Sequence, residues 1–239
     1  MIVHDIKEYF QIHMGKWRAF FGINQPDKLR QHDNTITKSI IGSNNELEYS
    51  NASLTSVVFD IVGNGNHINI KAGSNLNNVK FYVRGDNHNV SIGEECKFYN
   101  SVTLWLEDRE CGLTIGDKTE LYGYTTISVL EPCSQVTIGN NCLLSFNIDI
   151  RTSDSHSIID VATDKKINHA KNVSIGNHVW IGEHVIILKG VAINDDSIVA
   201  AGSVVTKSAD EKGIIVAGNP ARIVKRHITW SNERNYKSN

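Results

Sequence analysis

The stretch that decides the fold is V-S-I-G-N-H-V-W-I-G-E-H-V-I-I-L-K-G-V-A-I-N-D-D-S-I-V-A-A-G-S-V-V-T-K-S, residues 173–208. An aliphatic residue recurs there at every sixth position, as Ile175, Ile181, Ile187, Ile193, Val199 and Val205. Six residues are too many for one helical turn of about 3.6 residues. They fit a short strand followed by a turn, with the aliphatic side chain pointing inward. The period therefore predicts stacked triangular coils, each made of three strand–turn units.

A longer repeat precedes this stretch. The isoleucine of an Ile-Gly pair recurs every 23 residues at Ile92, Ile115 and Ile138, and a weaker copy lies at Ile70. We interpret this period as one coil with a five-residue extension at one corner, and Ile-Gly as an inward residue followed by a corner where φ is positive. An ordinary β-sandwich is the alternative, but its strands do not keep a six-residue phase through six consecutive units.

The ends of the chain lie outside the repeat. Apolar residues recur at three-to-four spacing near the start, so residues 1–40 predict an N-terminal helical cap over the open first coil. A helix on a membrane surface is the alternative, although its polar face has few lysines or arginines. We expect the β-helix domain to span residues 41–219, and residues 220–239 to form a short C-terminal helix and tail.

Composition limits the classes of function. The 239 residues are 40% hydrophobic and 21% charged with a net charge of −2, which gives no overall electrostatic case for binding nucleic acid. We find no signal peptide and no apolar run long enough for a transmembrane segment. The four cysteines form no C-x-x-C pair. These features predict a cytoplasmic protein with free thiols.

The repeat is interrupted once. Ile138 and Ile175 are 37 residues apart, fourteen more than the period, so one corner carries a long loop at residues 153–172. Near its start, His156 lies between Asp154 and Asp160. A neutral imidazole can take a proton from an attacking alcohol or amine, and either aspartate or a backbone carbonyl could fix its tautomer. The alternative is an ordinary surface histidine.

A resemblance to a known family rests on these motifs. The six-residue phase, A-A-G-S-V-V-T-K at 200–207 and A-G-N-P-A-R at 217–222 together resemble the hexapeptide-repeat acyltransferases, over roughly residues 60–226. The resemblance implies a left-handed parallel β-helix and a homotrimer with active sites between subunits. The order D-S-H-S-I, loop, I-G-N-H-V-W-I-G is similar to the capsule and polysialic acid O-acetyltransferases. Maltose and galactoside acetyltransferases are more distant, because they usually have proline where this chain has Ser157.

The resemblance also implies roles for individual residues. His156 would be the general base with Asp154 as a candidate partner, and Trp180 would line the site through its ring or its backbone N–H. Small residues let a pantetheine arm approach, and cations bind phosphates. The residues implied to bind acetyl-CoA in this way are Ala201, Gly202, Thr206, Lys207, Arg222 and Lys225. We expect no metal.

These observations predict an acetyl-CoA-dependent O-acetyltransferase acting by direct attack on a sugar hydroxyl, on a capsular or lipopolysaccharide glycan or its precursor. An N-acetyltransferase of the same fold, acting on an amino-sugar nucleotide or an antibiotic, is one alternative, and a non-enzymatic β-helix scaffold is another. A zinc carbonic anhydrase on this fold would need three converging histidines, and the sequence offers no convincing set.

Overall fold

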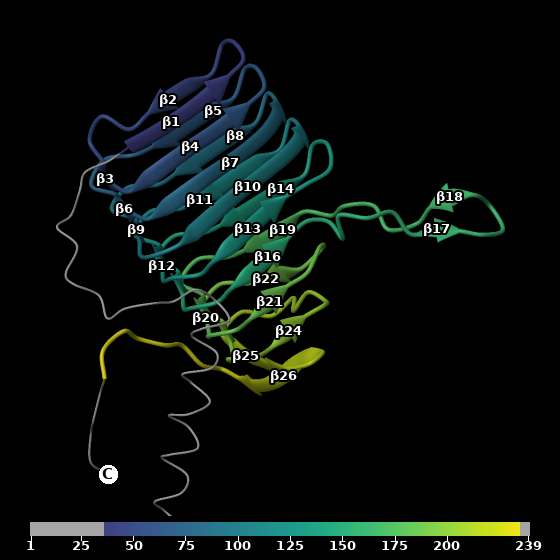
Figure 1. Cartoon of the computed structure of the whole chain (residues 1–239). Helices are drawn as coiled ribbons and strands as arrows, with labels where there is room; N and C mark the ends of the chain where they lie inside the picture. Colours follow the sequence, from purple (N-terminus) through teal and green to yellow (C-terminus); the bar gives the residue numbers. More distant parts are fainter. Residues whose placement is uncertain (1–35, 235–239) are drawn as a thin grey trace, which may run out of the picture. The chain divides into compact units, whose positions relative to one another are not determined.

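The computed structural model describes residues 36–234, and every regular element in that range is a β-strand (Figure 1). Successive strands wind round three parallel sheets, which we call face 1, face 2 and face 3. This is the solenoid that the hexapeptide period predicted, and it has the left-handed β-helix architecture that the resemblance implied. No helix able to span a bilayer occurs in the described range.

Each face is a ladder of strands from successive coils. Face 1 contains β1 (Ile36–Ile41), β4 (Val57–Val62), β7 (Val79–Asp86), β10 (Val102–Arg109), β13 (Thr126–Val129), β16 (Asp149–Arg151), β21 (Ile186–Ile187) and β24 (Val204–Val205). Face 2 contains β2 (Glu46–Glu48), β5 (His67–Ile70), β8 (Asn89–Ile92), β11 (Gly112–Ile115), β14 (Gln135–Ile138), β19 (Val173–Ile175) and β22 (Ala192–Ile193). Face 3 contains β3 (Ser53–Thr55), β6 (Asn75–Asn77), β9 (Lys97–Phe98), β12 (Glu120–Leu121), β15 (Leu143–Leu144), β20 (Trp180–Ile181), β23 (Ile198–Val199), β25 (Ile214–Gly218) and β26 (Ala221–Arg226).

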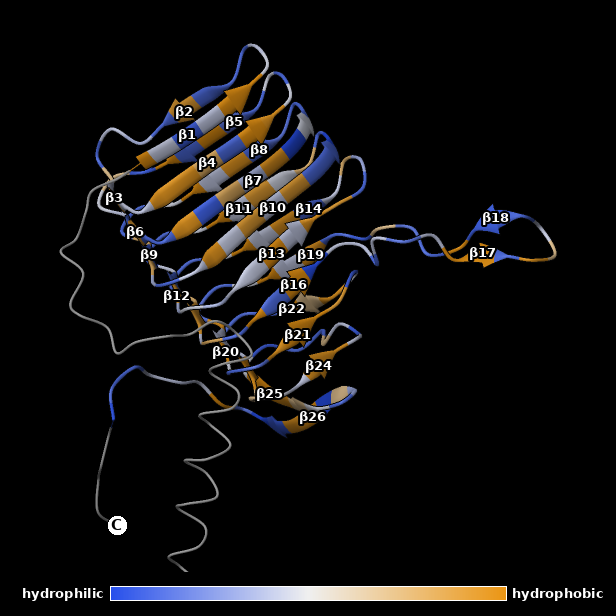
Figure 2. Cartoon of the chain, in the orientation of Figure 1, coloured by the Kyte–Doolittle hydropathy of each residue, from blue (hydrophilic) through white to orange (hydrophobic). Residues whose placement is uncertain are grey.

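The core is a set of aliphatic and aromatic ladders inside the prism. Ile115 pairs in register with Ile92 on one side and Ile138 on the other, and all three are buried. Phe59 and Phe81 stack in the same way, with ring centroids 4.8 Å apart. Hydrophobic and hydrophilic residues alternate along the strands (Figure 2), so each coil buries its inward side chains against its neighbours.

The glycine of the Ile-Gly pairs from Ile92 to Gly182 is required by close stacking and not by a positive φ. A Cβ atom on Gly116 would lie 2.6 Å from the carbonyl carbon of Gly139, and one on Gly139 would lie 2.6 Å from that of Gly176. The positive φ occurs two residues after the glycine, as at Lys118 (56°) and Asn141 (54°). This corrects the expectation that the glycine itself supplies the left-handed corner.

A polar ladder closes the corner between faces 2 and 3. Thr119 Oγ1 donates to the Gly139 carbonyl at 2.8 Å and accepts from the Cys142 N–H at 3.1 Å. Cys142 Sγ donates in turn to the Gly176 carbonyl at 3.1 Å. Burial raises the pKa of the Cys142 thiol to about 11, so this cysteine is a protonated structural residue. Cys96 and Cys142 are both buried in the core.

Two expectations about the ends of the β-helix are wrong. The strand β1 begins at Ile36, so residues 36–40 belong to the first coil and not to a helical cap. Residues 221–226 form β26, which pairs antiparallel with β25, instead of starting a C-terminal helix. Both segments continue a ladder whose exposed edge offers unpaired backbone groups, which favours a strand over a helix. The helix predicted within residues 1–35 lies outside the described residues.

The extensions of the 23-residue repeat lie where face 1 meets face 2: residues 107–109 lengthen β10 and residues 110–111 form the corner, and residues 130–134 form the same corner one coil later. The long loop at residues 153–172 leaves from this same corner, between β16 and β19. Its distal part is an antiparallel hairpin of β17 (Ile159–Asp160) and β18 (Lys165–Lys166), which projects from the body (Figure 1). The chain therefore departs from its regular path where the sequence predicted.

Replacing Gly139 by alanine tests the stacking constraint. We expect Gly139→Ala to lower the stability of the fold by about 1–3 kcal/mol, because the added methyl group meets backbone that cannot move aside. Thermal unfolding of the full chain, followed by circular dichroism, measures the effect. Gly112→Ala is the control: its Cβ would lie 3.5 Å from the flexible Gln135 side chain, so the melting temperature should not fall. Equal melting temperatures for the two variants would contradict the constraint.

Candidate functional site

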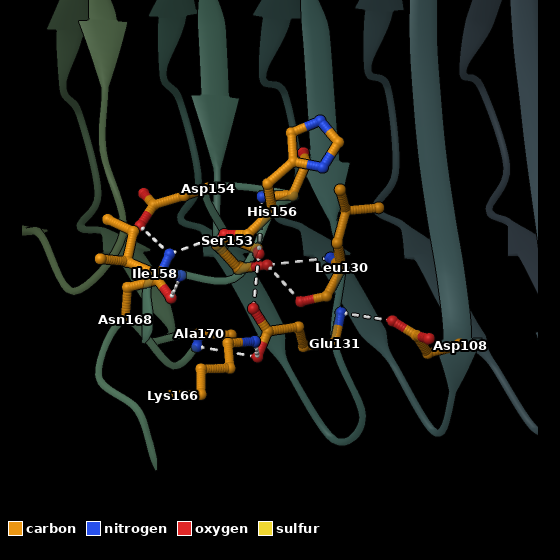
Figure 3. A network of polar contacts seen from close by, with 12 residues as sticks. Asp108, Leu130, Glu131, Ser153, Asp154, His156, Ile158, Lys166, Asn168 and Ala170 are labelled. Atoms are coloured by element: carbon orange, nitrogen blue, oxygen red, sulfur yellow. Dashed lines mark hydrogen bonds and ion pairs between the residues drawn. The ribbon is translucent and has the colours of Figure 1, made fainter. Parts of the chain in front are cut away.

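The long loop is closed on itself at its base by one buried amide. Asn168, which is 8% exposed, donates from Nδ2 to Asp154 Oδ2 and to the His156 carbonyl, both at 2.8 Å. Its Oδ1 accepts from the Ile158 N–H at 2.7 Å. One side chain at the C-terminal end of the loop therefore holds three residues at its N-terminal end, Asp154, His156 and Ile158 (Figure 3). This fixes the backbone on both sides of His156.

The neighbouring coils brace the loop from two directions. Lys189, from the following coil, donates to Asp154 Oδ2 at 2.5 Å and to the Asn168 carbonyl at 2.8 Å. The hydrogen bond from Lys189 lowers the pKa of Asp154 below its usual value. Glu131, from the preceding coil, accepts from Ser153 Oγ at 2.6 Å and pairs with Lys166 at 2.7 Å. Desolvation raises the pKa of Glu131, but the hydrogen bonds from Lys166 and Ser153 outweigh it and lower the pKa overall.

His156 is held through its backbone while its ring is free. Its N–H donates to the Asp154 carbonyl at 2.8 Å, and its own carbonyl accepts from Asn168. The exposed imidazole points away from the polar network (Figure 3). Among the described residues of this chain no hydrogen bond reaches either ring nitrogen. The carboxylate of Asp160 accepts from the N–H groups of Ala162 and Thr163 in its own turn, and that of Asp154 accepts from Asn168. Within one chain, neither of the two candidate aspartates therefore hydrogen-bonds the imidazole of His156.

In Trp180 the indole ring is accessible to a ligand, whereas the backbone N–H is already hydrogen-bonded. Its N–H donates to the Ser197 carbonyl at 2.9 Å as part of the face 3 ladder, which excludes the backbone alternative that the sequence left open. The side chain is 39% exposed on the outside of face 3, and Nε1 lies 3.4 Å from Ser145 Oγ. Trp230 packs beside it, with ring centroids 6.0 Å apart. Trp230 was not predicted; it follows the repeat, where no periodic signal exists.

One chain does not bring His156 and Trp180 together. The loop that carries His156 leaves from the corner between faces 1 and 2, whereas Trp180 belongs to face 3, opposite that corner. In Figure 1 the loop and β20 accordingly lie on opposite sides of the prism. Any site that uses both side chains must therefore be completed by a second copy of the chain.

The six residues predicted to bind the donor lie in three places. Ala201 and Gly202 lie at the corner between faces 3 and 1, and Arg222 and Lys225 lie on β26 at the end of face 3. Thr206 and Lys207 follow β24 and lie at the corner between faces 1 and 2, below the base of the long loop. The predicted set is thus spread over two corners and the end of face 3 in a single chain.

A line of small residues on face 3 was missed by the sequence analysis. Ser145, Gly182, Ala200 and Ala217 occupy equivalent positions in successive coils, each directly after the inward residue of face 3, because the N–H groups of the first three donate to the same ladder position of the next coil. Arg222 pairs with Ala217 at the lower end, and Trp180 lies beside the upper end. This line was missed because the hexapeptide pattern identifies the inward positions only. Aligning the repeats of the sequence with one another would have shown that a small residue follows the inward one in each of these coils.

The fold defines a class of protein: a parallel β-helix of hexapeptide repeats with one long loop carrying a histidine. A family model described as "Bacterial transferase hexapeptide (six repeats)" matches residues 172–207. The chain is 36% identical over 188 residues to the polysialic acid O-acetyltransferase of Neisseria meningitidis, across 70% of this chain and 86% of that one. It is 37% identical over 123 residues to the polysialic acid O-acetyltransferase of Escherichia coli O1:K1 / APEC, across 49% of this chain but only 39% of that one.

The structural comparison agrees. The crystal structure of the polysialic acid O-acetyltransferase OatWY superimposes with a TM-score of 0.80 and 30% identity, covering 84% of this chain and 94% of that one. The chain belongs to the hexapeptide-repeat acetyltransferase family, with polysialic acid O-acetyltransferases among its relatives. The resemblance derived from the sequence is therefore confirmed.

The braces at the loop base predict a pH-dependent protection. We expect Asp154→Asn to speed amide hydrogen exchange across residues 155–167 at pH 7, because it removes the ion pair to Lys189. The folded pKa of Asp154 is lowered, so the ion pair contributes fully above the ordinary pKa of about 3.9 and is lost as pH falls through the lower folded value.

Hydrogen-exchange mass spectrometry of the full chain measures this protection. The wild type should stay protected from pH 7 down to about pH 4 and open below it. Exchange in β4 and β5, which pair only with strands of other coils and not with the strands at the base of the loop, serves as the internal control. Identical exchange of wild type and Asp154→Asn at pH 7 would show that the ion pair does not hold the loop.

Proposed function

We propose that this chain is an O-acetyltransferase that moves the acetyl group of acetyl-CoA to a sugar hydroxyl. Its family and its polysialic acid O-acetyltransferase relatives support acetyl transfer to a glycan. One observation carries the proposal: a loop braced at three points holds a histidine whose ring nitrogens have no partner among the described residues. Ordering a loop is costly in conformational entropy, so a braced backbone under a free imidazole is typical of a positioned base.

In the proposed reaction, His156 takes the proton of the acceptor hydroxyl as its oxygen attacks the thioester carbonyl carbon. The tetrahedral intermediate then collapses, the carbon–sulfur bond breaks, and the imidazolium returns the proton to the leaving sulfur. The products are an acetyl ester and the free thiol of CoA. The attack is direct, because the buried cysteines are remote from solvent and the hydrogen bond to Glu110 raises the pKa of exposed Cys133.

The donor would lie along the small-residue line of face 3. The short side chains of Ala200 and Ala217 leave room for the pantetheine arm, and Ala201 and Gly202 continue this surface at the adjacent corner. Arg222 uses one guanidinium nitrogen on the Ala221 carbonyl and keeps its remaining donors for phosphates. Thr206, Lys207 and Lys225 are proposed to bind the nucleotide end, with Thr206 and Lys207 contributed from the neighbouring copy's corner.

The proposed active unit is a homotrimer with three sites between subunits. The hairpin of the long loop exposes Ile158 (54%), Ile159 (46%), Val161 (99%) and Ile167 (60%) in a single chain. Four exposed aliphatic residues on a projecting hairpin need a covering surface. Packing against a neighbour would cover them and bring His156 to that neighbour's Trp180, so that each subunit supplies a different half of every site.

The proposed acceptor is a hydroxyl of a capsular or lipopolysaccharide glycan or of its precursor, modified in the cytoplasm without a metal. An amine acceptor is the second candidate class, and the stability of the product separates the two, because mild alkali cleaves an ester and spares an amide. A scaffold without activity would release no thiol from acetyl-CoA with any glycan.

Removing the imidazole tests the base. We expect His156→Ala to lower turnover by about 10²–10⁴-fold, the usual contribution of a positioned base. Thiol release from acetyl-CoA with a glycan acceptor measures the rate. The ring makes no contact that stabilises the chain, so the melting temperature and the oligomeric mass should match the wild type. A fully active variant would overturn the proposed mechanism.

Mixing two inactive variants tests the assembly of the site. His156→Ala and Trp180→Ala subunits, co-expressed with different tags and purified as mixed oligomers, should regain activity, because some interfaces then pair an intact histidine with an intact tryptophan. In a purified mixed trimer of either composition, one interface of the three pairs the two intact residues, so about one third of the sites should be restored. Mixed oligomers that stay inactive would place both residues in the site of one chain.

A further inference from the structure

Beside Trp180 the structure contains a hollow that the proposed chemistry does not use. Its volume is about 340 Å³, and it lies between face 3 and the C-terminal segment of the described chain. Its walls come from two successive corners and strands and from the segment after β26: Lys118, Glu120, Asn141, Cys142, Leu143, His178, Trp230, Ser231 and Asn232. The volume is within the range of about 300–1,000 Å³ that is common for small-molecule sites.

The C-terminal wall of this hollow is fixed in place. The indole of Trp230 stacks on His178 with ring centroids 4.5 Å apart and planes at 11°, and its Nε1 donates to the His178 carbonyl at 2.8 Å. His178 in turn binds Asp196 at 2.9 Å. The hollow is therefore formed by ordered groups and not by a loose tail crossing the surface.

The hollow adjoins the proposed acetyl-transfer site. Leu143, which lines it, pairs in register with Trp180 of the next coil. Trp230, which closes it, has its ring centroid 6.0 Å from that of Trp180. A molecule bound in the hollow would thus lie about one coil, roughly 4.8 Å, from the tryptophan of the site.

The polar groups in the hollow suit hydroxyls. Within the described residues, the side-chain amides of Asn141 and Asn232 have no hydrogen-bond partner, so both their donors and their acceptors are available. Glu120 adds a carboxylate that also accepts from Tyr122 Oη at 3.2 Å. Leu143 and Trp230 supply apolar surface. This mixture of amides, a carboxylate and an aromatic ring matches a pyranose, which has hydroxyls at its rim and C–H groups on its faces.

The charges of the hollow argue against the phosphates of acetyl-CoA. Lys118 and Glu120 both line the hollow, and each already has a partner of opposite charge: Lys118 lies 3.9 Å from Glu95, and Glu120 pairs with Lys97 at 2.9 Å. A pyrophosphate would find one ammonium group beside one carboxylate, whereas Arg222 and Lys225 lie farther down face 3. A second copy of the chain also fits poorly, because the cores of protein interfaces are depleted in charged residues.

We propose that this hollow binds one sugar unit of the acceptor, next to the unit that receives the acetyl group. The inference rests on the proposed function and extends it: the enzyme prefers an acceptor of at least two linked sugars. The KM for the acceptor should therefore fall as a single sugar is lengthened to an oligosaccharide.

Two substitutions on different elements test the hollow. Asn141→Gly removes the amide and keeps the corner, because glycine accepts the φ of 54°. Glu120→Gln removes the charge and keeps the shape of the side chain. With sialic acid oligomers of two to six units as acceptors, we expect each variant to raise the acceptor KM about tenfold, the effect of losing one good hydrogen bond. The KM for acetyl-CoA and kcat should not change.

Asn44→Gly is the matched control, because Asn44 has a φ of 55° at an exposed corner of the first coil and should leave both KM values unchanged. Saturation-transfer NMR of a sialic acid tetramer gives a second readout that does not need turnover: the signal should weaken in Asn141→Gly and persist in Asn44→Gly.

The inference is overturned if the acceptor KM is unaltered, if the KM for acetyl-CoA rises instead, or if the variants change the oligomeric mass measured by light scattering. If the proposed acetyl transfer itself is wrong, the wild type would release no thiol from acetyl-CoA with any oligomer. The NMR measurement would then still decide whether the hollow binds sugar.

Discussion

The structure depends on the close contact between coils at the Ile-Gly corners. There the backbone of one coil leaves no room for a side chain on the next, and the isoleucine before the glycine fills the interior. Because parallel strands lie about 4.8 Å apart, every coil must repeat this arrangement in phase, and any additional residues must leave at a corner. The regular prism therefore determines where a functional loop can begin.

The fold could be predicted because equivalent contacts recur in successive coils of a solenoid, so the residues that make them recur at a fixed interval in the sequence. The interval between Ile92, Ile115 and Ile138 in the sequence is the register between β8, β11 and β14 in the structure. The two ends of the prism were wrongly assigned because their strands have a neighbouring coil on one side only. Residues 36–40 and 221–226 pair on one side only, so their sequences lack the full ladder pattern and depend on an edge that periodicity does not describe.

The site was less predictable than the fold. The loop and its histidine were found as an interruption of the repeat, but the braces were not, since Asn168, Lys189 and Glu131 come from three separate segments and meet only in the folded chain. For Trp180 the structure shows that the N–H donates within the face 3 ladder, a pairing that follows from the register and not from the motif, so only the ring is left for the proposed role. Chemistry that depends on contacts outside the repeat leaves no period in the sequence.

A rigid prism also constrains how such an enzyme can be assembled. Faces separated by a packed core cannot approach one another, so a base at one corner and a ring on the opposite face cannot act together by bending the chain. In the proposed trimer, a rotated copy would bring the corner of one prism to the face of another without any movement of the coils. The same contact would cover the apolar hairpin, so a single surface would both stabilise the oligomer and complete the site. Catalytic activity would then depend on the interface. An acceptor bound in the hollow beside Trp180 could be acetylated only when that interface has formed.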